Sequence, residues 1–181
     1  QLKDLRYLDL SNNPINDDLE GLEGLTNLQT LLLNKNFQWG TDDKISDISA
    51  LSNLKDLTTL DLSYNQISDI SSLSGLKNLQ SLNLQNNKVS NITPLKDYLS
   101  ALKLLDLMGN QITDISALSN LSSLTHLDIV DNPINDIQVL SNLGGLEWVS
   151  LYGTNIDTSA ESEDMQVIND LRARGCTVLC N

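Results

Sequence analysis

One pattern of about 22 residues recurs along most of the chain, and this period constrains the fold more than any other feature. The repeat reads L-x-x-L-x-x-L-x-L-x-x-N-x-I-x-D-I-x-x-L-x-x, and the stretch that begins at Leu54 follows it closely. The pattern fits again from Leu2, Leu25, Leu76, Leu99, Leu121 and Leu143. A fixed period in this range indicates a solenoid, in which each coil packs on its neighbours instead of around a central core.

Each coil is expected to begin with a short strand around its L-x-L pair, with the two apolar residues inward and the middle residue outward. Stacked strands of this kind predict an α/β solenoid with a parallel concave sheet and short helical turns or loops on the convex side. Residues 1–157 then hold seven repeats, with an insertion at 37–44. The pairs begin at Leu8, Leu31, Leu60, Leu82, Leu105, Leu127 and Val149.

Two polar columns within the repeat are interpreted as structural. An Asn amide carries donors and an acceptor, so the column after each strand can satisfy buried backbone groups between coils. This column holds Asn13, Asn36, Asn65, Asn87, Asn110 and Asn132, and it is expected to end at Thr154. The second column is expected to cap a helical turn on the convex side. It holds Asp17, Asp47, Asp69, Asn91, Asp114 and Asp136.

Residues 158–181 depart from the repeat and predict a cap over the last coil. Thr158 and Glu161 have capping-box spacing, and an apolar stripe at helical spacing follows, made of Met165, Ile168 and Leu171. Gly175 is a plausible helix stop, and residues 176–180 alternate as an edge strand does. In an extended strand the two cysteines, Cys176 and Cys180, are too far apart to bridge, whereas a tight turn would allow a disulfide; both states stay open.

Composition excludes several classes of function. The formal net charge of −13 argues against a nucleic-acid partner, whose phosphates need a basic face, and against an anionic membrane surface. No apolar run approaches the ~18 residues of a membrane span, so no membrane insertion is expected. No nucleophile elbow, phosphate loop or CxxC motif is present, so we expect neither catalysis nor a cofactor.

The segments Asn65–Leu79 and Asn110–Leu118 resemble the 22-residue leucine-rich repeats of bacterial internalins. The same repeat class occurs in the regulatory subunit of protein phosphatase 1, which Leu19-Glu-Gly-Leu22 resembles. The resemblance implies a surface or secreted protein that binds a partner through its concave face. It also implies an alternative, a regulatory or targeting subunit that holds an enzyme such as a phosphatase.

The outward positions of the coils differ between the two ends of the solenoid. The third and fourth coils show small polar residues, whereas the last three show apolar and aromatic ones, and such a patch on a polar surface indicates an interaction site. These residues are Leu104, Met108, His126, Val130, Trp148 and Tyr152. The alternative is that the cap covers the residues of the last coil, Trp148 and Tyr152.

The middle-of-strand column is acidic in four coils. We interpret Asp61, Asp106 and Asp128 as selecting a basic patch on the partner, although a merely solvated polar face stays open. Tyr64 and the inserted Phe37 and Trp39 are further candidates for contact at the rim.

The hypothesis is therefore a monomeric protein–protein interaction module that binds through its concave face. A remote alternative is a carbohydrate- or metal-binding module. For a metal, the candidate ligands are His126, Asp106, Asp128 and Asp131.

Overall fold

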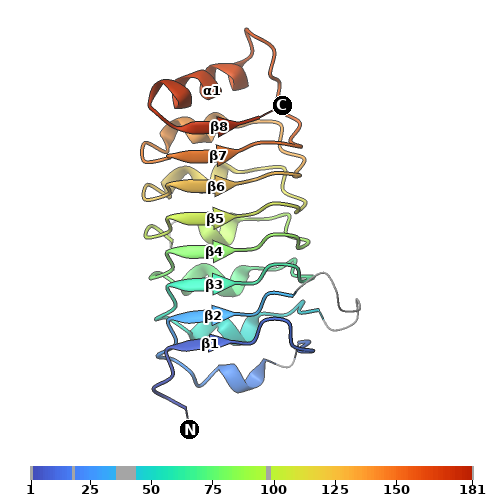
Figure 1. The fold of residues 1–181 in the computed structure, drawn as a ribbon, viewed down its shortest axis with the longest axis vertical. Coiled ribbons are helices and arrows are strands. Elements are labelled where there is room, and N and C mark those ends of the chain that lie inside the picture. Colours follow the sequence, from blue (N-terminus) through green and yellow to red (C-terminus); the bar gives the residue numbers. More distant parts are fainter. Residues whose placement is uncertain (1, 18, 36–43, 97–98, 181) are drawn as a thin grey trace.

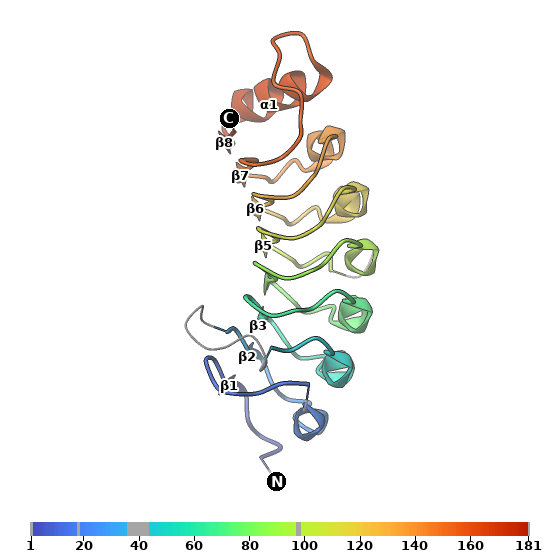
Figure 2. The same ribbon diagram turned by 90° about the vertical axis from the view of Figure 1, so that its right-hand side faces the viewer.

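The computed structural model describes residues 2–17, 19–35, 44–96 and 99–180. They form a curved solenoid with a parallel sheet on one side and short 3-10 turns on the other (Figures 1 and 2). The sheet holds eight strands in sequence order. They are β1 (Tyr7–Asp9), β2 (Thr30–Leu32), β3 (Thr59–Asp61), β4 (Ser81–Asn83), β5 (Leu104–Asp106), β6 (His126–Asp128), β7 (Trp148–Ser150) and β8 (Thr177–Leu179). The α/β solenoid and the concave parallel sheet are confirmed, with each strand starting one residue before its L-x-L pair.

Leucine and isoleucine fill the interior between the sheet and the turns. Leu60, Leu82 and Leu127 point inward from the centres of their strands and are almost fully buried. The convex side consists of 3-10 turns, whose inward residues join the same core. The turns are η1 (Glu20–Leu22), η2 (Ser49–Asn53), η3 (Ser71–Gly75), η4 (Thr93–Leu95), η5 (Ser116–Asn120) and η6 (Gln138–Asn142).

The asparagine column forms the predicted ladder between coils. The Asn110 amide nitrogen donates to the Leu84 carbonyl of the previous coil and to the Leu107 carbonyl of its own, both at 2.9 Å. Its Oδ1 atom accepts the Val89 N–H at 2.9 Å. Equivalent bonds are made by Asn65, Asn87 and Asn132. The two ends of the column differ: the exposed Asn13 side chain donates to the Ser11 carbonyl of its own coil, and the Thr154 hydroxyl donates to Leu151 of its own coil. Asn36 lies outside the described residues.

The second column caps the turns on the convex side. The Asp69 and Asp114 carboxylates each accept the N–H two residues later, from Ser71 and Ser116, at 2.8 Å. These backbone N–H groups lower the pKa of both carboxyls. Asp17 differs, because its carboxylate accepts N–H groups of the next coil.

The C-terminal cap consists of helix α1 (Glu163–Ala173) and β8. The capping-box prediction at Thr158 was wrong, because the N-cap is Ser162, whose hydroxyl accepts the Met165 N–H at 3.0 Å. The predicted stop at Gly175 is confirmed: its φ is +89°, a conformation that favours glycine. The buried residues of α1 are Asp164, Val167, Ile168 and Leu171. The predicted stripe is thus confirmed at Ile168 and Leu171, whereas Met165 is only half-buried.

Strand β8 pairs in parallel with β7 and closes the C-terminal end of the sheet. Cys176 and Cys180 flank this extended strand as free thiols, so the bridged alternative is wrong. Burial raises the pKa of the Cys176 thiol. Within the described part of the chain, no helix has both the length and the apolar character needed to span a membrane.

Candidate functional site

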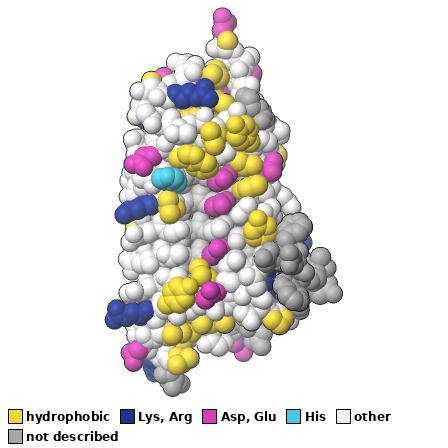
Figure 3. Space-filling model, in the orientation of Figure 1, with side chains coloured by type: hydrophobic (Ala, Val, Ile, Leu, Met, Phe, Trp, Pro, Cys, Tyr) yellow, Lys and Arg dark blue, Asp and Glu magenta, His cyan; other side chains and the backbone are white. Residues whose placement is uncertain are grey.

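The parallel register sets three columns of outward residues side by side over β5, β6 and β7. Leu104, His126 and Trp148 begin these strands, and Asp106, Asp128 and Ser150 end them. Met108, Val130 and Tyr152 follow two positions later. The two carboxylates therefore lie between two largely apolar columns. Figure 3 shows acidic side chains in a file down the sheet face, with hydrophobic side chains gathered beside its upper end and a second group beside its lower end.

The acidic column has a structural role that the sequence analysis missed. Each side chain accepts the backbone N–H two residues later and so shapes the turn that follows the strand. Asp106 accepts from Met108 at 3.0 Å and Asp128 accepts from Val130 at 3.0 Å. Asn83 makes the same bond to Gln85 at 2.9 Å.

The residue that donates this N–H also determines how well the carboxylate is stabilised. Asp61 accepts a second bond at 2.7 Å from the Ser63 hydroxyl, and Asp9 accepts one from Ser11. Met108 and Val130 bring no hydroxyl, so Asp106 and Asp128 have a single donor each among the described residues.

The electrostatics follow from this difference. The Ser11 hydroxyl, together with its N–H, lowers the pKa of Asp9. Burial is the main reason that the pKa of Asp106 is raised to about 6; the bond from Met108 opposes this shift, and the nearby charges of Asp128 and Asp61 add to it. Burial also raises the pKa of Asp128. The two carboxylates at the C-terminal half of the sheet are thus the poorly stabilised ones.

The apolar columns beside them stay accessible. Leu104 and Tyr152 expose 44% and 42% of their surface. The His126 ring stacks on the Trp148 ring, with centroids 6.4 Å apart and planes inclined by 22°. The cap places Thr177 beside Trp148, yet the indole is only half-buried. The expected alternative, in which the cap covers Trp148 and Tyr152, is therefore wrong.

An open hollow of about 540 Å³ lies on the sheet face, and the column of Met108, Val130 and Tyr152 is not among its lining residues. Leu104, Asp106, His126, Asp128 and Trp148 line it on the side of β5 to β7. Ser81 and Asn83 of β4 line the other side, and the sequence analysis did not select them. The sequence signal was their small size: beside the larger side chains of β5 they leave the space that forms the hollow.

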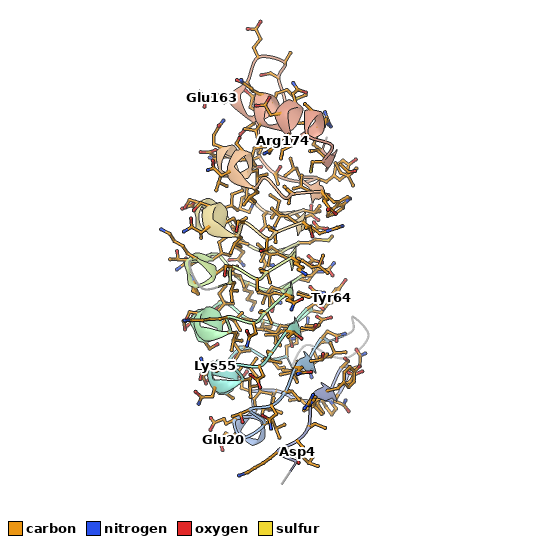
Figure 4. The ribbon with its side chains drawn as sticks, turned by 90° about the vertical axis from the view of Figure 1, so that its left-hand side faces the viewer. Asp4, Glu20, Lys55, Tyr64, Glu163 and Arg174 are labelled. Atoms are coloured by element: carbon orange, nitrogen blue, oxygen red, sulfur yellow. The ribbon has the colours of Figure 1, made fainter. Side chains whose placement is uncertain are left out.

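The remaining candidates lie apart from the hollow. Asp61 is on β3, with Asn83 of β4 between it and Asp106. Tyr64 follows β3 with a φ of +61° and lies on the strand side of the coil, opposite Lys55 (Figure 4). Phe37 and Trp39 lie outside the described residues.

The described side chains bring together no group of three or more His, Cys, Asp or Glu residues that could hold a metal ion. His126 instead has its Nδ1 atom 3.0 Å from the Thr125 hydroxyl and its ring on Trp148. The site therefore offers shape, apolar surface and uncompensated negative charge as its means of recognition.

Comparisons with known proteins agree with this architecture. The family described as Leucine Rich repeats (2 copies) matches residues 42–75, 55–97 and 100–142, and Leucine Rich Repeat matches residues 4–25. No curated protein sequence matches the chain.

Two similar solved structures are internalins from Listeria monocytogenes. The inlF structure has a TM-score of 0.84 and 32% identity over 98% of this chain, and the chain covers 48% of its length. The inlC2 structure has a TM-score of 0.74 and 31% sequence identity. That match covers 97% of this chain and 80% of the inlC2 chain. Neither comparison shows a link to the phosphatase regulatory subunit. The chain belongs to the leucine-rich-repeat family, and its repeats are of the internalin-like class.

Proposed function

We propose that this protein binds a partner protein through its concave face, at the cluster formed by β5, β6, β7 and the residues that follow them. The leucine-rich-repeat fold and its internalin-like neighbours support a protein-interaction module in general. Recognition at this cluster requires complementary shape and charge on a rigid scaffold, and no catalytic step.

The observation that carries the proposal is the contrast between the middle strands of the sheet and the strands at its C-terminal end. Polar residues occupy the outward positions of β3 and β4, whereas Leu104, Tyr152 and the stacked pair of His126 and Trp148 expose apolar surface on β5 to β7. Aromatic side chains with accessible faces dominate the energetics of protein interfaces. The formal net charge of the chain, −13, favours a partner with a basic patch.

Site-specific photo-crosslinking tests this assignment. A photoreactive phenylalanine analogue at Leu104 is expected to crosslink a discrete partner, whereas the same analogue at Tyr7 is not. Tyr7 is a matched control because it begins β1, faces the same side and exposes 58% of its surface. The double variant Leu104→Ala, Tyr152→Ala is then expected to weaken capture of that partner at least about tenfold, since each buried anchor is typically worth more than 1 kcal/mol. Crosslinking at Tyr7 but not at Leu104 would contradict the proposal.

A further inference from the structure

The carboxylates of Asp106 and Asp128 are adjacent and incompletely satisfied. They occupy paired positions on neighbouring parallel strands, whose spacing is about 4.8 Å. In each, the Oδ1 atom accepts one backbone N–H, and no donor among the described residues faces the second oxygen. No lysine or arginine of the described residues forms an ion pair with either. The pair therefore presents two open acceptor atoms to a ligand.

This arrangement is specific to the site and is not a property of the repeat. In the first and third coils the equivalent carboxylates receive a serine hydroxyl as well, from Ser11 and Ser63. In the fifth and sixth coils Met108 and Val130 replace the serine, and both acids are half-buried. Side-by-side like charges without a counter-charge are unfavourable, and partial burial increases that cost. A cation at this position would remove both penalties.

The walls of the hollow match a long cationic side chain better than a simple ion. Leu104, at the other end of the strand that holds Asp106, lines the hollow and offers apolar surface to an aliphatic stem. The stacked rings of His126 and Trp148 line the same hollow and add aromatic surface beside the two carboxylates. A guanidinium group carries donors in a flat fork that can reach two carboxylates at once, and it stacks on aromatic rings.

We propose that this hollow receives an arginine side chain of the partner, with its guanidinium group between the carboxylates of Asp106 and Asp128 and its stem on Leu104. The inference rests on the proposed function, because it names the group that the concave face recognises. It explains why the two least stabilised carboxylates of the sheet lie inside the hollow and beside its aromatic residues.

The test is a titration of the ¹⁵N-labelled protein with Nα-acetyl-arginine-N-methylamide, followed by NMR. The Met108 and Val130 amide signals report directly, because these N–H groups donate to the two carboxylates. We expect saturable shifts of both signals, with a Kd on the order of 1 mM for a ligand of this size. The norleucine derivative, which has an aliphatic stem and no charge, is expected to cause no saturable shift. Equal binding of the norleucine derivative would overturn the proposal.

The matched variant is Asp106→Asn with Asp128→Asn. It removes both charges but keeps the turns, because Asn83 already makes the same backbone bond on β4. We expect the Kd of the arginine derivative to rise at least about tenfold in this variant and to stay unchanged in Asp9→Asn, which alters the same column at the far end of the sheet. An unchanged Kd in the double variant, or a lysine derivative that binds as tightly, would contradict the guanidinium site.

Failure of this inference and failure of the proposed function are separable. If the partner crosslinks at Leu104 but its binding is unaffected by Asp106→Asn with Asp128→Asn, the interface stands and the arginine site is wrong. If the arginine derivative binds as expected but the partner crosslinks elsewhere, the cation site stands and the concave-face assignment is wrong.

Discussion

The imidazole of His126 and the indole of Trp148 stack across neighbouring strands, with 6.4 Å between ring centroids. Their strand positions are directly paired in the register of β6 and β7. Because the pair holds the indole at the border of the hollow, its stability bears on the binding surface itself. Aromatic pairs are worth about 0.5–1.5 kcal/mol beyond their burial.

A double-mutant cycle measures this relationship. We expect His126→Ala and Trp148→Ala to couple by about 0.5–1 kcal/mol in the free energy of unfolding, from urea denaturation. Tyr7→Ala combined with Trp148→Ala is the control, because β1 and β7 are far apart and their effects should add. A coupling for the stacked pair no larger than that of the control would show that the contact contributes nothing.

The difference in stability between Asp106→Asn and wild type should depend on pH. The folded-state pKa of Asp106 is raised from 3.8 to about 6, mainly by burial, so the folded protein binds this proton more tightly than the unfolded chain. Stability is then lost as pH rises from about 4 to 6. The variant cannot titrate, and above pH 6 it should be more stable than wild type by about 1–2 kcal/mol, after allowance for solvent screening.

Urea denaturation of Asp106→Asn and wild type at pH 4 and pH 7 checks this prediction. We expect the two free energies of unfolding to differ at pH 7 and to agree at pH 4. Asp9→Asn is the matched control and should respond in the opposite sense. Hydrogen bonds lower the pKa of Asp9, so removal of its charge loses stability at pH 7. His126 lines the same hollow, and it is present in both proteins, so the comparison isolates Asp106. Equal stabilities at pH 7 would contradict the raised pKa.

The repeat period was enough to predict the fold, because each coil position has one physical task. The L-x-L pairs placed the seven strands of the repeats to within one residue, and the Asn column predicted hydrogen bonds such as that between Asn110 and Leu84. The start of α1 was missed because a tertiary contact decides it. Asp164 accepts the Asp157 and Ile137 N–H groups, which holds the first turn of the helix against the last coil.

The candidate site was predictable in its columns but not in its depth. Register alone placed Leu104, His126 and Trp148 side by side. The hollow, however, depends on the small side chains of β4 beside the large ones of β5, and the sequence pattern does not give the burial of Asp106 within it. The sequence shows that a serine follows Asp61 two positions later, whereas Met108 follows Asp106. The hydrogen bonds explain the difference: the Ser63 hydroxyl donates to Asp61, and Met108 offers Asp106 only its backbone N–H.

Asn110→Ala should be among the most destabilising single substitutions in the repeats. The side chain is only 7% exposed and bonds backbone groups of two coils, all of which lose a buried partner. We expect a loss of about 2–4 kcal/mol in the free energy of unfolding. Asn78→Ala is the control: its exposed side chain donates one bond, to the Lys55 carbonyl, and its loss should cost less than about 1 kcal/mol. Similar losses in the two variants would refute the ladder as a major source of stability.

Gly109→Ala should strain the turn after β5. Gly109 has a φ of +68°, and a Cβ atom there would lie 2.4 Å from Asn86 Oδ1. We expect a loss of about 1–2 kcal/mol in unfolding free energy. Thermal denaturation of both variants checks this prediction. Gly24→Ala is the control and should show no measurable loss of stability, because no atom lies within 4 Å of the added carbon. A Gly109→Ala protein as stable as wild type would show that the turn relaxes freely.

Asp164→Ala should loosen the cap without unfolding the solenoid. The buried Asp164 carboxylate accepts the Ile137 N–H at 3.2 Å and the Asp157 N–H at 3.0 Å, so the variant leaves both amides unpaired. We expect faster hydrogen exchange at these two amides and along α1, by about ten- to a hundredfold, because a lost charged acceptor costs about 1.5–3 kcal/mol. Exchange at the Val89 amide, which Asn110 holds several coils away, should be unchanged. Uniform acceleration at all these positions would instead indicate that the cap and the repeats unfold as one unit.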